Sequence, residues 1–154
     1  MNPQGFPSLP TLIRVERELG AALPDHCFVG GVCSGFYVRD LAITELRTTT
    51  DVDLVVEVVT LTERYSLESR LREQGLENDP TLTCRWRFEE LVLDIMPTVE
   101  NSMGFSNRWY PEVLRTCEAM DIDGVQLRYP NVWAFLATKI EAFNDRGGGR
   151  LCGE

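Results

Sequence analysis

Apolar residues follow a helical spacing in some stretches of the chain and a strand-like spacing in others. Helical spacing predicts helices over residues 10–23, 36–43, 61–74 and 131–145. Strand-like spacing predicts strands after His26 and over residues 48–59, 82–88, 91–96, 115–119 and 125–128. Helices and strands that intermingle along one chain predict an α/β (α+β) fold, in which helices flank a mixed sheet.

The predicted strand at 48–59 carries two carboxylates at the head of an apolar run. Side chains alternate between the faces of a strand, so Asp51 and Asp53 are expected on one face. The other face then carries Val52, Leu54, Val56 and Val58. Neighbouring carboxylates repel each other unless a cation shares them, and such oxygen ligands suit Mg²⁺. We interpret this strand as a metal platform; a solvated Asp-rich turn is the alternative.

A third carboxylate, Asp94, lies in the middle of an apolar strand. Residues 82–88 and 91–96 read as an antiparallel hairpin with a turn at Glu89 and Glu90. A charge within such a strand is costly unless it is paired or bound to a cation. Asp94 is therefore a candidate functional residue.

Residues 26–35 read as a strand, a glycine turn and the start of a helix. Backbone N–H groups in such a turn can contact a phosphate, so Gly30, Gly31 and Ser34 are candidate phosphate-binding residues. His26 has no partner motif, and we expect a structural role for it. A second Asp-x-Asp pair, at residues 121–123, precedes a glycine and no apolar run, which predicts a hairpin turn.

Length, charge and cysteine content narrow the class of protein. The 154 residues fit one domain, expected over residues 1–146 and followed by a flexible glycine-rich tail at 147–154. The net charge of −9 disfavours nonspecific adhesion to nucleic acid or anionic membranes. With no membrane-length apolar run and no signal-peptide pattern, we expect a cytoplasmic protein. Five scattered cysteines without a CxxC pair suggest neither a disulfide framework nor a zinc site.

Taken in order, these residues resemble the nucleotidyltransferases of the DNA polymerase β superfamily. Their signature is a glycine turn, an Asp-x-Asp strand and a third acid further on. The resemblance is closest to the AbiEii/AbiGii-like and MenT-like branch, which includes type IV toxins. There a VGG turn, an RxTxDhD-like segment and a K-hxAF-xxR helix are typical. This chain has Val29 to Gly31, Arg47 to Asp53 and Lys139 to Arg146 in the same order.

The resemblance implies transfer of a nucleotidyl group from a nucleoside triphosphate to an acceptor hydroxyl, with release of pyrophosphate. It also implies two Mg²⁺ ions, with Asp51 and Asp53 holding both and Asp94 holding the one nearer the acceptor. The implied phosphate-binding residues are Gly30, Gly31, Ser34, Lys139, Arg47 and Arg146.

The acceptor stays open at this stage between RNA, a protein and a small hydroxylated molecule. A toxin-like member would act on tRNA and have a cognate antitoxin as a partner. An aminoglycoside-type transferase is one alternative, since an acidic surface suits a cationic substrate. A nucleotide-binding module that keeps the fold without catalysis is the other.

Overall fold

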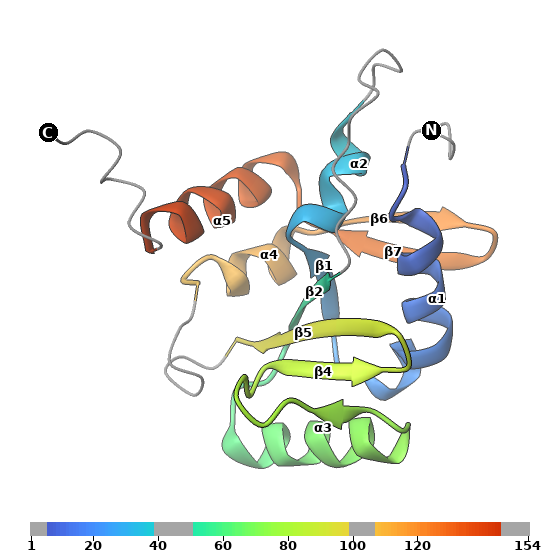
Figure 1. Cartoon of the computed structure of the whole chain (residues 1–154). Helices are drawn as coiled ribbons and strands as arrows, with labels where there is room; N and C mark the ends of the chain where they lie inside the picture. Colours follow the sequence, from blue (N-terminus) through green and yellow to red (C-terminus); the bar gives the residue numbers. More distant parts are fainter. Residues whose placement is uncertain (1–5, 39–50, 99–106, 146–154) are drawn as a thin grey trace, which may run out of the picture.

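A mixed five-stranded sheet lies at the centre of the computed structural model, which describes residues 6–38, 51–98 and 107–145 (Figure 1). The strand order is β1-β2-β5-β4-β3. The strands are β1 (His26–Val29), β2 (Asp51–Val56), β3 (Glu77–Asn78), β4 (Arg85–Phe88) and β5 (Leu91–Pro97). Strands β2 and β5 are parallel, whereas the pairs β1–β2, β4–β5 and β3–β4 are antiparallel.

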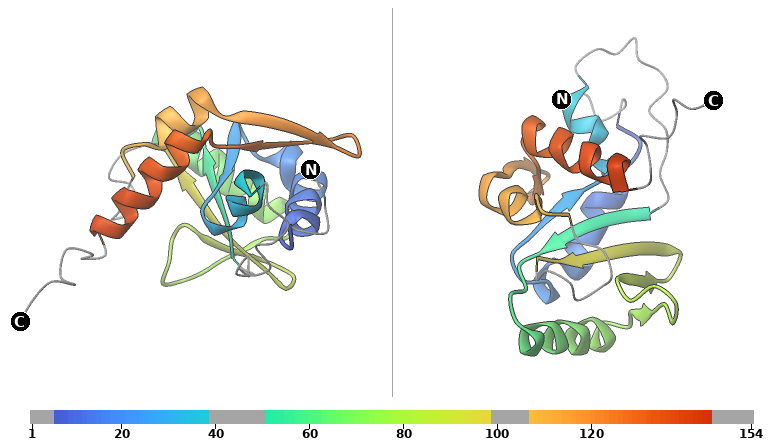
Figure 2. Two further views of the ribbon diagram at one scale, coloured as in Figure 1. Left: turned by 90° about the horizontal axis from the view of Figure 1, so that it is seen from above. Right: turned by 90° about the vertical axis from the view of Figure 1, so that its left-hand side faces the viewer.

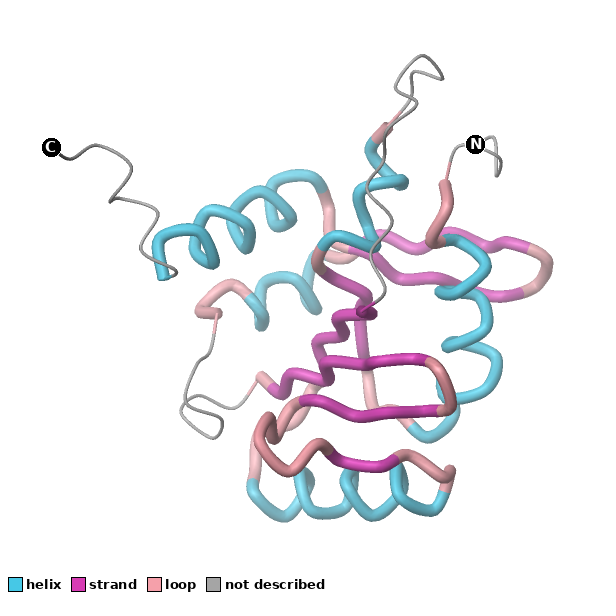
Figure 3. The backbone as a smooth tube through the Cα atoms, viewed as in Figure 1, coloured by secondary structure: helices cyan, strands magenta, loops and turns pink. Residues whose placement is uncertain are grey.

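Helices and a second, two-stranded sheet surround the central sheet, as the backbone trace shows (Figure 3). The α-helices are α1 (Leu9–Leu19), α2 (Ser34–Tyr37), α3 (Leu61–Glu73), α4 (Tyr110–Thr116) and α5 (Val132–Asp145). The 3-10 turns are η2 (Gly20–Ala22) and η3 (Gly31–Cys33), and the second sheet is the hairpin β6 (Glu118–Ile122) and β7 (Val125–Tyr129). This arrangement confirms the predicted mixed α/β fold.

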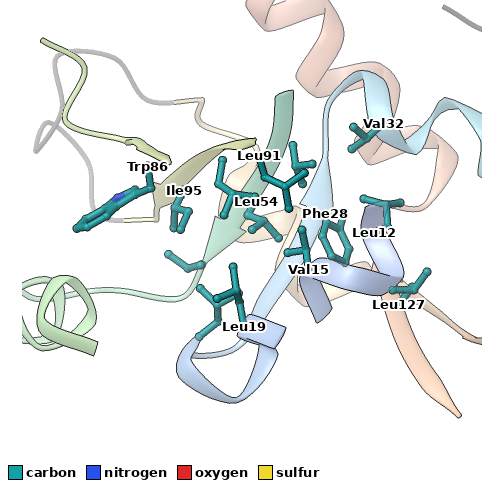
Figure 4. Close-up of a cluster of buried hydrophobic side chains, with 14 of the residues drawn as sticks. Leu12, Val15, Leu19, Phe28, Val32, Leu54, Trp86, Leu91, Ile95 and Leu127 are labelled. Atoms are coloured by element: carbon teal, nitrogen blue, oxygen red, sulfur yellow. The ribbon is translucent and has the colours of Figure 1, made fainter. Parts of the chain in front are cut away.

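The central sheet is covered on both faces, because alternate residues of its strands enter two separate cores. Leu54 and Leu93 belong to the larger core, which α1, α3 and β7 complete (Figure 4). Val55 and Met96 belong to the smaller core, which α4 and Ala134 of α5 complete. Both views in Figure 2 show α4 and α5 next to each other. The smaller core is the one that adjoins the carboxylates.

Helix α3 begins and ends where the sequence predicts. The Thr60 hydroxyl accepts a hydrogen bond from the Glu63 amide at 3.2 Å, and the Glu63 carboxylate accepts one from the Thr60 amide at 3.1 Å. This reciprocal pair is a capping box, which the pattern of Thr60 followed three residues later by Glu63 indicates from the sequence. At the other end Gly75 adopts a φ of +87°, which suits glycine and ends the helix.

Helix α4 was not predicted from the sequence. Residues 97–112 read as a loop and residues 115–119 as a strand, but Tyr110–Thr116 is helical and the strand begins only at Glu118. Tyr110, Val113 and Leu114 are buried at helical spacing, and Pro111 suits the first turn. The helix is short, and packing against the sheet rather than local sequence stabilises it.

Helix α5 has bounds close to the predicted ones, but the apolar stripe that its sequence places at Val132, Leu136, Ile140 and Phe143 does not face a core. Val132, Leu136, Ile140 and Phe143 are between 44% and 60% exposed. The residues that α5 buries are instead Ala134 and Thr138. No helix within the described ranges combines the length and apolar character needed to cross a bilayer.

His26 has the structural role expected from the sequence. Its Nδ1 lies 2.8 Å from the Pro24 carbonyl oxygen and its Nε2 lies 2.8 Å from a Glu16 carboxylate oxygen. Burial acts to lower the pKa of His26, but the Glu16 carboxylate outweighs it and the net pKa is raised. The imidazole therefore ties β1 to α1.

Candidate active site

Asp53 and Asp94 lie side by side on the two parallel strands at the centre of the sheet. The register pairs Asp53 of β2 with Asp94 of β5, and Val55 with Met96. Paired residues of adjacent strands project from the same face, and this face is the one that α4 and α5 cover. Asp51 is two residues from Asp53 and so shares that face. The three predicted acids therefore project from one side of the sheet.

Gly30 lies against Asp53, at the end of the neighbouring strand β1. Val29 pairs with Asp53 in the register of β1 and β2, and Gly30 follows with a φ of +74°. A Cβ atom at position 30 would collide with the Asp53 carboxylate. Glycine is therefore required here both by the backbone conformation and by the close approach.

Asp53 is a largely buried carboxyl with a raised pKa. Burial raises the pKa of Asp53 to about 6, and the neighbouring carboxylates of Asp94 and Asp51 add to the rise. Lys139 and Arg85 oppose it. A further cation nearby would stabilise the ionised form of Asp53.

Arg85 of β4 supplies a cation to the other two acids. Its Nε and one terminal nitrogen each donate to a different oxygen of Asp94, both at 2.8 Å. The same terminal nitrogen lies 3.2 Å from an oxygen of Asp51. The register of β4 and β5 places Arg85 directly opposite Asp94. The guanidinium thus bridges acids on two different strands.

A cavity of about 410 Å³ opens beside Asp53 and Asp94. Its wall comes from the β1 turn, β2, β5 and the α4–α5 pair: Val29, Gly30, Asp53, Asp94, Met96, Asn107, Tyr110, Thr138, Lys139, Ala142 and Asp145. Lys139 extends from α5, with its ammonium 5.6 Å from the centre of the Phe135 ring. The cavity therefore combines two carboxylates of the sheet, a glycine turn and a lysine.

The remaining sequence-predicted residues divide into two groups. Gly31 begins η3 and Ser34 begins α2, and neither lines the cavity. Asp51 contacts Arg85 beside the cavity rather than lining it. Arg47 and Arg146 lie outside the described residues.

Arg85 and several cavity residues, among them Asn107, Tyr110, Thr138 and Asp145, were not predicted from the sequence. Arg85 had a usable signal, because a two-residue turn at Glu89 and Glu90 fixes the hairpin register that sets Arg85 opposite Asp94. Asn107 donates to the Thr138 carbonyl oxygen at 3.0 Å and so joins the start of α4 to α5. These two residues, and Tyr110 beside them, carry no local motif.

The carboxylates suit a divalent cation in chemistry but are not arranged as a finished metal site. Hard carboxylate oxygens are the ligands that Mg²⁺ prefers. Yet within the described ranges no three His, Cys, Asp or Glu side chains are placed to hold a metal ion together. The Arg85 guanidinium already occupies the position of a cation between Asp51 and Asp94. Its positive charge faces the carboxylate oxygens that a metal ion would otherwise contact.

Solved structures with the same fold are nucleotidyltransferases. ANT(2″)-Ia in complex with adenylyl-2″-tobramycin superposes with a TM-score of 0.53 at 17% identity, over 92% of this chain and 82% of that one. An antigenic nucleotidyltransferase-like protein from Paracoccidioides brasiliensis gives 0.55 at 17% identity, over 92% and 68%. The solution structure of the antibiotic-resistance factor ANT(2″)-Ia gives 0.55 at 15% identity, over 93% and 77%. No protein-family model and no curated protein matches the sequence.

The chain therefore has a nucleotidyltransferase fold, as its sequence predicts. At these identities the likeness extends to the fold alone. The assignment to the AbiEii/AbiGii-like or MenT-like branch stays a prediction from sequence motifs.

Proposed function

We propose that the protein transfers a nucleotidyl group from a nucleoside triphosphate to an acceptor hydroxyl. The observation that carries this proposal is the pairing of Asp53 with Asp94 beside Gly30, on the wall of a cavity that Lys139 also lines. Placing two adjacent carboxylates on a half-buried sheet face costs free energy. Such an arrangement is typical of catalytic and binding sites. The nucleotidyltransferase fold adds support of a different kind.

Each residue has a task that matches its chemistry. Gly30 lets a phosphate approach the backbone closely, and Lys139 provides a compact positive charge to a triphosphate. Asp51, Asp53 and Asp94 would hold two Mg²⁺ ions. Bound Mg²⁺ would stabilise the attacking and leaving oxygens of an in-line displacement at phosphorus. The predicted contributions of Gly31, Ser34, Arg47 and Arg146 to phosphate binding remain part of the hypothesis.

The reaction balances as a single displacement. The acceptor oxygen forms a bond to the α-phosphorus, and the bond from that phosphorus to the bridging oxygen of the β-phosphate breaks. Pyrophosphate leaves with the electron pair of the broken bond. Asp94, on the cavity wall, takes the hydroxyl proton or orients the hydroxyl for attack.

A small, cationic, hydroxylated molecule is the acceptor that the charges favour. The cavity wall carries Asp145 in addition to Asp53 and Asp94, and the whole chain has a net charge of −9. This balance attracts cations and repels nucleic acid. The relative solved with adenylyl-2″-tobramycin is consistent with this class of acceptor. A tRNA acceptor and a cognate antitoxin stay predictions of the toxin-like resemblance.

Incubation with α-labelled nucleoside triphosphates, Mg²⁺ and one acceptor at a time tests the proposal. Tobramycin and total tRNA serve as the two acceptors. We expect label on the small cation and release of pyrophosphate. Label on tRNA instead would support the proposed transferase activity but show that the acceptor is RNA rather than a small cation.

A module that binds nucleotide without catalysis is the second candidate. One observation favours it: Arg85 occupies two of the three acids that a metal would need. This candidate predicts that nucleotide binds while no acceptor becomes labelled at any Mg²⁺ or Mn²⁺ concentration. Pyrophosphate release in the presence of an acceptor would exclude it.

A further inference from the structure

We propose that Arg85 is an internal counter-cation that competes with divalent ions for the site carboxylates. The inference rests on the proposed function, since it concerns the same acids. It assigns to Arg85 the task of neutralising the carboxylates when no metal is bound. It also predicts that Arg85 sets how readily a metal binds.

The contacts of Arg85 are too specific to be an incidental surface ion pair. Its guanidinium makes a two-pronged contact with Asp94 and a third contact with Asp51, which lies on a different strand. The Asp94 side chain is only 18% exposed and that of Arg85 is 26% exposed. A planar fork is the geometry that fits a carboxylate best, and partial burial strengthens it.

The neighbouring arginine on the same strand shows what an ordinary contact looks like. Arg87 is two residues from Arg85 and so projects from the same face of β4. It pairs with Asp79 through a single contact of 3.3 Å, and its side chain is 56% exposed. Arg87 therefore provides a matched control, with the same residue type, strand and face but an ion pair with Asp79 in place of the contacts that Arg85 makes.

Arg85 and a divalent ion would compete because both are positively charged and both contact the same carboxylate oxygens. Three carboxylates bring three negative charges, and Arg85 neutralises one while occupying both oxygens of Asp94. A divalent ion bound to those oxygens would lie within repulsive reach of the guanidinium. Arg85 must move aside, or weaken its hold, for a metal to bind.

Titration of Mn²⁺ without nucleotide, with free Mn²⁺ measured by electron paramagnetic resonance, tests this proposal. We compare the wild type, Arg85→Met and Arg87→Met, because methionine keeps the apolar stem and removes the charge. Arg85→Met should bind Mn²⁺ about tenfold more tightly than the wild type, since one repelling charge is gone. Its melting temperature in EDTA should fall and its rise on Mn²⁺ addition should exceed that of the wild type. Arg87→Met should match the wild type in both readouts.

Arg85→Lys covers the case in which the methionine variant fails to fold. Lysine keeps the charge but loses the fork, so its Mn²⁺ affinity should lie between those of the wild type and Arg85→Met. Equal or weaker Mn²⁺ binding in both Arg85 variants overturns the proposal. If nucleotidyl transfer by the wild type is detected alongside that result, the proposed function stands and only the competition fails. Absence of Mn²⁺ binding in every protein would overturn both.

Discussion

The chain contains the Asp-x-Asp pattern twice, and the two copies differ in every respect except spacing. Asp51 and Asp53 stand on β2, in the middle of the sheet, where Asp53 pairs with a third carboxylate. Asp121 and Asp123 stand at the tip of the β6–β7 hairpin. Asp123 adopts a φ of +53° in the turn, and Asp121 accepts a hydrogen bond from the Gly124 amide at 3.1 Å. The second pair builds a turn.

The comparison shows that surroundings, rather than spacing, make a pair of acids into a candidate site. Carboxylates at the hairpin tip are solvated and need no cation. The pair on β2 is partly buried, so water screens its charges less. The carboxylates therefore repel each other more strongly. Only the first pair therefore has a reason to recruit a cation.

The largest difference between the two pairs should appear in catalysis. Asp53→Asn removes a charge from the cavity wall and should lower the rate of nucleotidyl transfer by about a hundredfold to a thousandfold, as loss of one central electrostatic contact does. Asp121→Asn keeps the oxygen that accepts from Gly124 and should leave the rate unchanged. Steady-state pyrophosphate release measures both. Equal activity of Asp53→Asn and the wild type would remove Asp53 from the site.

Two glycines with similar backbone angles extend the same comparison. Gly30 and Gly124 have φ values of +74° and +76°, so alanine is strained at both. At position 30 the added Cβ would also collide with the Asp53 carboxylate, whereas at position 124 it would meet nothing within 4 Å. Gly30→Ala should therefore lose most of the activity and roughly 2 to 4 kcal/mol of stability, and Gly124→Ala about 1 kcal/mol. Urea unfolding and pyrophosphate release separate the two effects.

In the absence of metal, the substitution that lowers activity at Asp53 should raise the free energy of unfolding. The pKa of Asp53 is raised from 3.8 to about 6 by burial and neighbouring carboxylates, so its ionisation opposes folding. This penalty is absent below pH 4 and develops as the pH rises to about 6. In EDTA at pH 7, Asp53→Asn should unfold with a free energy higher by roughly 2 to 3 kcal/mol. At pH 4 the gain should nearly vanish, and denaturant titrations at both values test it.

The sequence predicted the parts of the site that local patterns encode. Alternation along the strand at 51–58 placed the acids on one face and Val52, Leu54 and Val58 on the other, and these three apolar residues indeed lie together in the larger core. The capping box at Thr60 fixed the start of α3. Such features depend on residues close in sequence, so a pattern reveals them.

The parts that the sequence did not reveal depend on residues distant in the chain. Asn107 enters the cavity wall only because α4 packs against α5, and neither helix signals that contact. The apolar stripe of α5 predicted a core-facing helix, yet Ile140 and Phe143 are exposed. Periodicity specifies which residues share a face but not what that face contacts.

The smallest effect belongs to the second Asp-x-Asp pair itself. Asp121→Ala removes the carboxylate that accepts from the Gly124 amide and should cost about 0.5 to 1 kcal/mol, because the turn is exposed and water can replace the lost acceptor. Asp121→Asn should cost less, since its amide oxygen can still accept. Neither change should alter Mn²⁺ binding or transfer. A loss of metal affinity in Asp121→Ala would place the hairpin tip within reach of the site and overturn the contrast between the two pairs.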